Sequence, residues 1–377
     1  MKRVAIIGAG AAGCFCAAAL HRMSPDCQIK IYESGPVPMA KLALTGGGRC
    51  NLTNTFEEVE DLSKVYPRGY RLMKRALNSF GPDDTKEWFR SLGVRLKVED
   101  GGRVFPCSDD AMEIVGAIRK CLEGVEIETR HPVRTVDELQ GYDAIVVTTG
   151  GGTAKIVESL GINIREQVPS LFTFNVNDKE LNTLGGIVLN DVSVGISGTK
   201  FKSDGNVLLT HWGLSGPAIL RLSSYAAESL HDSGYRAVLS INYHTDLDAL
   251  SEGNSQKMIR STHPDNIPSR FWEYLTAKAG MRPDIRWAEA GSKGLNRLKN
   301  ILTNDCYEIS GKGAFKEEFV TCGGVSLDEL NPGTLESKKC PGLYFAGEVL
   351  DIDAVTGGFN LQAAWTTAYL AARSIAE

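Results

Sequence analysis

Apolar and polar residues at the start of the chain alternate in blocks that predict a strand, a helix and a second strand. Residues 4–7 (VAII) form a short apolar run, and residues 28–32 (QIKIY) form another. Between them an alanine-rich stretch over 14–22 favours a helix, and glycines stand at positions 8, 10 and 13 before it. This order predicts the opening unit of a parallel α/β sheet.

The glycines match the pattern G-x-G-x-x-G, in the strand–helix context that gives the pattern its meaning. Gly8 permits a tight turn, Gly10 lets the backbone approach a diphosphate, and Gly13 lets helix and strand pack closely. The first helical turn, at Ala11 and Ala12, then directs free N–H groups and a partial positive charge at phosphates. The motif predicts a dinucleotide-binding fold of the Rossmann type.

An acid ends the second predicted strand. Glu33, followed by Ser34, lies twenty residues beyond Gly13. A carboxylate at this place accepts hydrogen bonds from ribose hydroxyls and repels a 2′-phosphate. The motif therefore predicts FAD or NAD rather than NADP, and it leaves the choice between the first two open.

Two further segments favour FAD. Residues 41–54 (KLALTGGGRCNLTN) supply a glycine backbone that can lie flat against a ligand, while Lys41 and Arg49 offset diphosphate charge. Residues 342–362 run from a buried strand through an acid and a Gly-Gly turn into a helix. The acid suits ribityl hydroxyls, and the helix N-terminus suits the isoalloxazine edge of a flavin, whose reduced, anionic form its dipole would stabilise. The FAD contacts expected from these segments are Lys41, Gly46, Gly47, Gly48, Arg49, Cys50, Asn51, Gly347, Glu348, Asp353, Gly357, Gly358, Asn360, Leu361 and Gln362.

The middle of the chain has a different pattern. Residues 94–105 predict a hairpin that turns at Asp-Gly-Gly, and residues 131–136 and 142–149 predict strands. From about 168 to 243, short alternating runs between Gly, Asn and Asp predict an antiparallel sheet or small barrel, whereas residues 247–311 predict helices. The expected fold class is α/β. It has a Rossmann-type FAD domain built from both chain ends (1–165 and 325–377), a β-rich, barrel-like domain (166–246 and 312–324) and a helical subdomain inserted at 247–311.

Composition narrows the class of protein. The chain has 377 residues, of which 42% are hydrophobic and 23% charged, as in ordinary globular proteins. Its apolar runs are all shorter than the roughly 20 residues that span a bilayer, and no targeting segment is recognisable, so we expect a cytoplasmic protein without a membrane anchor. Nine cysteines are scattered without a Cys-x-x-Cys pair, which predicts neither a disulfide framework nor a metal site.

Residues 251–300 carry an unusual charge. They hold nine Lys or Arg against five Asp or Glu, a local net charge of +4 in a chain of net charge −5. Phe271, Trp272, Tyr274 and Trp287 lie between the cations. Such a segment could follow phosphates and stack bases, which predicts an RNA contact. The alternative is a solvated helical face over a small aromatic core.

With these segments in view, the chain resembles the YhiN/BaiN-type flavoproteins, also described as aminoacetone-oxidase-like FAD-binding proteins. The resemblance rests on KLALTGGGRCNLTN, GGRVFPCSDDA, LLTHWGLSGPAIL and GLYFAGEVLDIDAVTGGFNLQAAW, which are spread along nearly the whole chain. Asp110 and Ala354 depart from the expected pattern, but neither touches the phosphate-binding glycines. The resemblance implies further nucleotide contacts and a middle domain that covers the flavin, which makes His211 and Ser215 candidates to face it. The alternative for these two residues is a structural turn. These further nucleotide contacts are Val133, Thr149, Gly150 and Gly151.

The expected chemistry is hydride transfer through flavin N5. A second nucleotide fingerprint is missing, so NAD(P)H would visit the flavin transiently as reductant, and the missing Cys-x-x-Cys disfavours a disulfide reductase. The family resemblance implies reduction of carbon–carbon double bonds or oxidation of small amines, and in one version the reduction of uridine in ribosomal RNA to dihydrouridine. The proton that must accompany the hydride could come from Cys50 or His211. The alternative for Cys50 is a structural role under the glycine loop. Two alternatives stay open: an FAD-binding sensor without enzymatic activity, and an NAD-dependent dehydrogenase. Substrate and oligomeric state stay undetermined.

Overall fold

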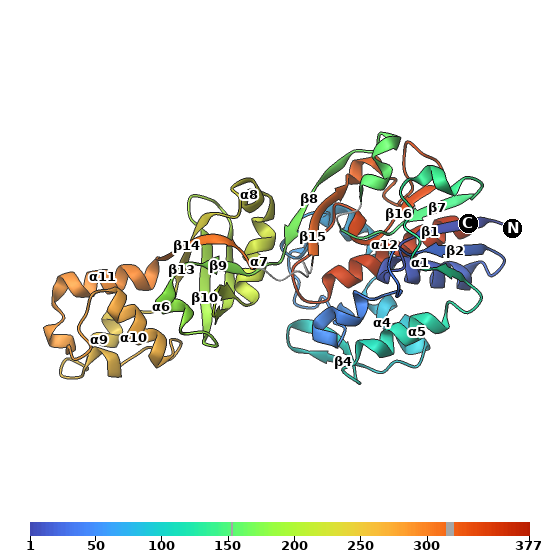
Figure 1. Ribbon diagram of the computed structural model, residues 1–377. Helices are drawn as coiled ribbons and strands as arrows, with labels where there is room; N and C mark the ends of the chain where they lie inside the picture. The colour runs from blue at the N-terminus through green and yellow to red at the C-terminus, as the bar shows by residue number, and fades with distance from the viewer. Residues whose placement is uncertain (152–153, 314–319) are drawn as a thin grey trace. The chain divides into compact units, whose positions relative to one another are not determined.

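The computed structural model describes residues 1–151, 154–313 and 320–377, which divide into two compact units (Figure 1). Unit 1 comprises residues 1–168 and 320–377, and unit 2 comprises residues 169–319. The sequence placed the corresponding boundaries at 165 and 325. Residues 314–319, which the sequence assigned to the β-rich domain, lie outside the described residues.

Unit 1 is built on a parallel sheet of five strands drawn from both ends of the chain. The strand order is β16 (Leu343–Phe345), β7 (Ala144–Val147), β1 (Arg3–Ile7), β2 (Gln28–Tyr32) and β6 (Glu126–Glu128). Helices α1 (Ala11–Met23) and α12 (Phe359–Ala376) lie side by side in this unit (Figure 1). Both helices are rich in alanine, which lets their backbones approach closely. The fold class expected from the sequence, a Rossmann-type domain assembled from both chain ends, is confirmed.

Smaller elements complete unit 1. Helices α2 (Leu62–Val65), α3 (Tyr70–Ala76), α4 (Pro82–Ser91) and α5 (Ala111–Lys120) accompany an antiparallel sheet of β3 (Thr53–Asn54), β5 (Arg103–Pro106) and β4 (Leu96–Glu99). Strands β8 (Ile164–Ser170) and β15 (Val320–Val325) form a separate pair. The predicted hairpin is confirmed as β4 and β5. The predicted strand over 131–136 is wrong, because the chain leaves the sheet after β6 and the proline at position 132 cannot donate to a ladder.

Unit 2 contains a closed barrel of six antiparallel strands. Their order is β10 (Val188–Ile196), β11 (Lys202–Thr210), β12 (Gly213–Ser215), β9 (Phe174–Val176), β14 (Asp305–Lys312) and β13 (Ala237–Asn242). Helices α6 (Lys179–Asn182), α7 (Pro217–Tyr225) and α8 (Ala227–Asp232) accompany the barrel. Alternating apolar residues of the strands fill its interior, as the sequence pattern predicted.

The connection from β13 to β14 carries the helical insertion, which contains α9 (Leu247–Ser251), α10 (Ser269–Lys278) and α11 (Gly291–Thr303) (Figure 1). The sequence extended this insertion to residue 311, but residues 305–312 form barrel strand β14. A buried carboxylate joins the insertion to the barrel: Asp305, 1% exposed, accepts hydrogen bonds from Lys278 at 2.6 Å and from two tyrosines, Tyr243 at 2.7 Å and Tyr307 at 2.5 Å. Within the described residues, no helix combines the length and the apolar character needed to cross a bilayer.

Candidate functional site

The turn between β1 and α1 shows why its three glycines differ. A Cβ at Gly8, whose φ is +103°, would lie 2.6 Å from the carbonyl oxygen of Thr148. A Cβ at Gly13 would lie 2.0 Å from the carbonyl oxygen of Gly8, so helix and strand are in contact there. A Cβ at Gly10 would meet nothing within 4 Å, and no side chain caps the helix at this residue. The turn is therefore closed toward the protein and open above Gly10, where the N–H groups of the first helical turn begin.

Glu33 closes the other side of this turn. Its Oε2 accepts a hydrogen bond from Ala9 N at 2.8 Å, and its Oε1 accepts from Gly35 N at 2.6 Å and from Ser34 Oγ at 3.3 Å. The carboxylate is thus fixed beside the glycine turn at the carboxyl end of β2. This is the edge of a parallel sheet at which ligands bind in open α/β folds.

The triple-glycine loop lies in the left-handed region of backbone space. Gly46, Gly47 and Gly48 have φ values of +58°, +68° and +85°. Side chains would be strained at all three, yet a Cβ at Gly47 or Gly48 would meet nothing within 4 Å. Asn51 joins this loop to the start of α12, because its side-chain amide, oriented to satisfy both groups, accepts from Gly358 N at 3.0 Å and donates to Thr53 O at 3.1 Å. The loop is an open stretch of backbone with an anchored end.

Arg49 does not have the role expected from the sequence. Its guanidinium pairs with Glu99 and, at 2.6 Å, with Asp109, and it stacks on the ring of Phe105 at 4.2 Å. The Arg49 guanidinium holds the pKa of Glu99 below its usual range, and Lys97 together with Arg49 does the same for Asp109. The sequence predicted that Arg49 would offset the charge of a diphosphate, but its guanidinium already pairs with two carboxylates. Arg49 instead links the glycine loop to the β4–β5 hairpin.

Cys50 lies beneath the loop. Its side chain is 0% exposed, its backbone φ is +58°, and burial raises the pKa of its thiol to about 12. A thiol in this position reaches no substrate in solution. The catalytic role expected for Cys50 is therefore disfavoured, and the structural alternative fits its burial.

The C-terminal segment places a second helix N-terminus in the same unit. Gly347, two residues after the end of β16, donates from its N–H to Thr367 Oγ1 at 2.9 Å, and a Cβ there would lie 2.7 Å from the Cβ of Ala12. At the start of α12, a Cβ on Gly358, whose φ is +92°, would lie 2.3 Å from Thr53 O. No side chain caps α12, so its first N–H groups stay available. The end of β16 thus lies against the first turn of α1.

Several residues expected to contact the ligand anchor this segment instead. Asp353 is buried in an ion pair with Arg68. Gln362 is 0% exposed, and its Oε1 accepts from Thr53 Oγ1 at 2.5 Å and from Thr85 Oγ1 at 2.9 Å. Asn360 bonds both backbone groups of Ala354, at 2.9 and 2.8 Å, and Leu361 is half-buried at the third residue of α12. The sequence identified the segment but not these internal partners.

The loop after β7 meets the loop after β16. Glu348 accepts a hydrogen bond from Thr321 N at 2.8 Å, and a Cβ at Gly151 would lie 3.2 Å from Glu348 Oε1. A Cβ at Gly150 would lie 3.6 Å from the same carboxylate, at Oε2. The structure therefore brings the predicted residues Gly150, Gly151 and Glu348 together, with Thr149 just before them, at the carboxyl edge of the sheet. Val133 is half-buried in the loop after β6.

His211 and Ser215 belong to unit 2. His211 is exposed in the turn between β11 and β12, and its ring lies over Gly185, where a Cβ would come within 2.7 Å of the imidazole. Ser215 shares a hydrogen bond with Thr173 Oγ1 at 3.0 Å, at the end of β12. Ser215 therefore has a partner in the barrel wall, while the imidazole of His211 reaches solvent.

The aromatics of the basic segment are not available to stack on bases. Phe271 and Trp272 are 0% exposed, Trp287 is 4% exposed, and Tyr274 donates to Asp178 at 2.7 Å. They form the core of the insertion, which corrects the expectation of base stacking there. Most of the cations lie on the surface, and within the described residues six of them form no ion pair with a carboxylate. These six are Lys257, Arg260, Arg270, Arg286, Lys293 and Arg297, called here the six exposed cations.

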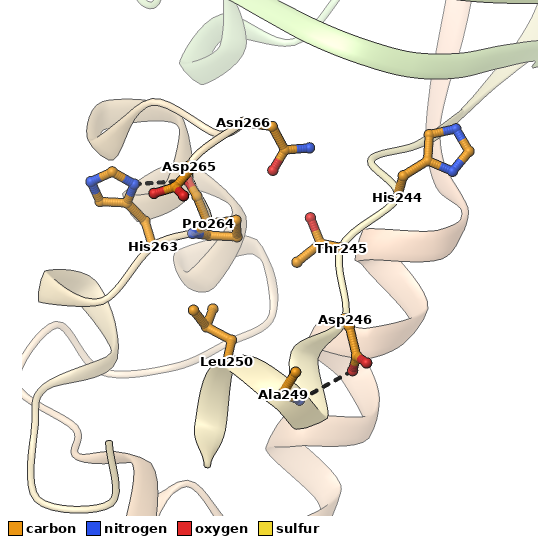
Figure 2. A pocket seen from close by; sticks show the side chains of 9 residues that line it. All are labelled: His244, Thr245, Asp246, Ala249, Leu250, His263, Pro264, Asp265 and Asn266. Atoms are coloured by element: carbon orange, nitrogen blue, oxygen red, sulfur yellow. Dashed lines mark hydrogen bonds between the residues drawn. The ribbon is translucent and has the colours of Figure 1, made fainter. Parts of the chain in front are cut away.

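A hollow of about 380 Å³ lies in the helical insertion, far along the chain from the glycine turns, and Figure 2 shows the side chains that line it. Two histidines line it, but their rings point away from each other. His244 shares a hydrogen bond with Ser193 at 2.7 Å, and His263 shares one with Ser269 at 2.8 Å. Each imidazole is therefore hydrogen-bonded to a different serine, and the two rings do not converge on a common ligand.

Similarity to known proteins extends over nearly the whole length of the chain. A family model described as HI0933-like protein Rossmann domain matches residues 2–374. The ribosomal RNA dihydrouridine synthase of Escherichia coli is 32% identical over 98% of this chain and 97% of its own length, and the 3-dehydro-bile acid delta(4,6)-reductase of Clostridium scindens is 27% identical over the full length of both. The 3-ketosteroid delta1-dehydrogenase of Sterolibacterium denitrificans shares the fold with a TM-score of 0.51 at 12% identity, covering both chains fully.

Proposed function

Since this chain belongs to the HI0933-like Rossmann-domain family, as the resemblance drawn from its sequence indicated, we propose that it is an FAD-dependent oxidoreductase with NAD(P)H as its reductant. The observation that carries the proposal is the pair of glycine-opened, uncapped helix N-termini, at α1 and α12, in one unit. Gly347 closely approaches Ala12, so the end of β16, which precedes α12 in the chain, lies next to the N-terminus of α1. We expect the protein to act in the cytoplasm.

The residues at this edge of the sheet fit FAD. The open space above Gly10 would receive the diphosphate, Glu33 would accept from ribose hydroxyls, and the exposed Lys41 is the cation left to offset phosphate charge once Arg49 is excluded. The open backbone of the glycine loop and the first N–H groups of α12 after Gly358 would border the isoalloxazine ring. When bound, FAD would supply hydride transfer between the reductant and a substrate carbon.

The substrate we favour is uridine in ribosomal RNA, reduced at its C5–C6 double bond. The relative at 32% identity over nearly the whole chain supports this choice. Because the double bond is conjugated with the C4 carbonyl, hydride adds at C6 and a proton adds at C5. The hydride and its electron pair come from NAD(P)H, and the proton comes from a protein acid or water. With Cys50 buried, the exposed imidazole of His211 is the acid we favour.

RNA would be held through its phosphates. The six exposed cations of the insertion reach solvent, whereas Phe271, Trp272 and Trp287 of the same segment are buried. Contacts of this kind carry no sequence information and weaken steeply with salt. A small conjugated enone is the second candidate substrate, favoured by the full-length similarity to the bile-acid reductase.

An anaerobic titration of the purified protein with NADH and NADPH, with and without ribosomal RNA, tests the proposal. We expect a yellow protein that one nicotinamide bleaches and that RNA reoxidises, with dihydrouridine appearing in the RNA. RNA in which dihydrouridine already replaces uridine is the matched control and should not reoxidise it. Reoxidation by small enones alone would move the substrate to the second candidate. A flavin that no reductant bleaches would overturn the enzyme and support an FAD-binding sensor, and a colourless protein would contradict FAD.

A further inference from the structure

A second hollow, of about 590 Å³, lies in unit 1 between the end of α4 and the start of β4. It is lined by Arg90 in the last turn of α4, by Arg95 directly before β4 and by Cys107 directly after β5. Val94, which is 4% exposed, and the half-buried Leu96 add an apolar lining. The volume lies in the range of small-molecule sites, and such sites combine apolar walls with a few polar groups.

The backbone places both arginines at this hollow. Gly93 N donates to Arg90 O at 2.9 Å where α4 ends, and a Cβ at Gly93, whose φ is +88°, would meet nothing within 4 Å. Beyond this turn, Cys107 N donates to Arg95 O at 2.8 Å, which extends the ladder between β4 and β5 by one residue pair. Arg95 and Cys107 therefore lie opposite each other, with their side chains on the same face of the hairpin.

The glycine loop contacts the same face of the hairpin. Phe105 and Lys97 form the next residue pair on this face after Cys107 and Arg95. Arg49 of the glycine loop stacks on the ring of Phe105 at 4.2 Å. Alternate residues of a strand are about 7 Å apart, so the hollow lies about that far along the hairpin from the contact with the glycine loop. The hollow is thus close to the loop that we expect to border the flavin.

The two arginines of the hollow differ from the neighbouring cations in their pairing. Arg49 and Lys97 both pair with Asp109. Arg90 and Arg95 are exposed, and neither forms an ion pair with a carboxylate among the residues that the structure describes. A guanidinium presents a planar array of donors that matches a phosphate. The hollow therefore fits a molecule that joins a flat apolar part to a phosphate group.

We propose that Arg90 and Arg95 bind the 2′-phosphate of NADPH, and that the protein uses NADPH in preference to NADH. The inference rests on the proposed function, in which a nicotinamide nucleotide reduces the flavin. The glycine turn after β1 cannot supply this contact, because the carboxylate of Glu33 beside it repels a 2′-phosphate. The two arginines offer the charge that distinguishes NADPH from NADH, and the apolar lining offers a surface for adenine. The adjoining glycine loop marks the direction in which the nicotinamide end extends.

Anaerobic reduction of the bound flavin, followed by its bleaching at increasing concentrations of each nucleotide, tests the inference. We expect the apparent Kd for NADPH to rise about 10- to 100-fold in Arg90→Ala and in Arg95→Ala, while the Kd for NADH stays the same because NADH lacks the phosphate. Arg119→Ala is the matched control, since it removes an exposed arginine from the last turn of α5, and it should change neither value. A wild-type protein that prefers NADH, or variants that lose affinity for both nucleotides equally, would overturn the inference.

A second readout does not depend on reduction of the flavin. The exposed thiol of Cys107 reports occupation of the hollow through its alkylation by iodoacetamide, which mass spectrometry of the peptide measures. We expect 2′,5′-ADP to protect Cys107 in the wild type and in Arg119→Ala but not in Arg95→Ala, and 5′-AMP, which lacks the 2′-phosphate, to protect it much less. Protection by a ribosomal RNA fragment but not by 2′,5′-ADP would assign the arginines to RNA phosphates and overturn the inference. Protection by 2′,5′-ADP in a protein whose flavin neither nucleotide reduces would contradict the proposed reaction and leave the phosphate site supported.

Discussion

The glycine turn gives the sharpest prediction, the replacement of Gly10 by alanine. Gly10 has φ −80° and ψ −165°, which any residue can adopt, and a Cβ there would meet nothing within 4 Å. The unfolding free energy of the apoprotein should therefore change by less than about 1 kcal/mol. The added methyl group would instead stand between the first N–H groups of α1 and a diphosphate.

The expected loss of affinity follows from hydrogen bonds to charge. Two such bonds, worth about 1.5–3 kcal/mol each, would be broken. Their loss raises the Kd for FAD by about 10²- to 10⁴-fold. Flavin fluorescence during titration of apoprotein with FAD measures the Kd, and urea unfolding of the same apoprotein measures its stability.

Two glycines serve as controls. Gly116 in α5 also has open space around its Cβ position, so Gly116→Ala should keep FAD affinity and gain about 0.5–1 kcal/mol of stability. Gly13→Ala should cost at least about 1–3 kcal/mol, because its Cβ would lie 2.0 Å from Gly8 O. If Gly10→Ala binds FAD as tightly as the wild type, the diphosphate does not lie at this turn and the reasoning is refuted.

The remaining predictions concern buried and paired groups. Cys50→Ala should keep at least a third of the wild-type kcat, because the thiol is wholly buried; a loss beyond about a hundredfold with FAD still bound would restore a catalytic role. Asp305→Asn should lower the unfolding free energy by about 2–4 kcal/mol in urea titrations, since it weakens three hydrogen bonds to a buried charge, and an unchanged midpoint would contradict this. The lowered pKa values of Glu99 and Asp109 mean that their pairs with Arg49 contribute stability above the ordinary carboxylate range near pH 4 and lose it as pH falls through the depressed values. FAD affinity measured from pH 7 to pH 5 should therefore not weaken through this network, and Arg49→Ala should weaken it at every pH by freeing the glycine loop.

Local patterns predicted most of the architecture. The G-x-G-x-x-G turn, the alternating runs of the barrel and the β4–β5 hairpin depend on residues close in sequence, so their periods and turn residues are visible in the chain. The two wrong secondary-structure predictions also had local causes. Residues 131–136 have a β-like composition, but the proline at 132 cannot join a ladder, and residues 305–312 continue a helical stretch without a signal that a barrel strand begins.

Residues that act through distant partners could not be assigned from the sequence. Arg49 next to three glycines suggests a phosphate ligand, yet its carboxylates lie 50 and 60 residues away, and Asp353 meets Arg68 from 285 residues away. The aromatics among the cations of 251–300 suggested base stacking until their burial placed them in the core. No periodicity distinguishes an exposed indole such as Trp212 from a buried one.

By itself, then, the sequence determined the α/β fold, the use of both chain ends in one sheet and the segments that would surround a dinucleotide. These follow from backbone rules, because strands, glycine turns and helix starts are specified within a few residues. Tertiary structure alone decided which charges remain available, which thiol is hidden and which ring meets solvent. Those properties depend on burial and on pairing between distant segments, which arise only when the chain has folded.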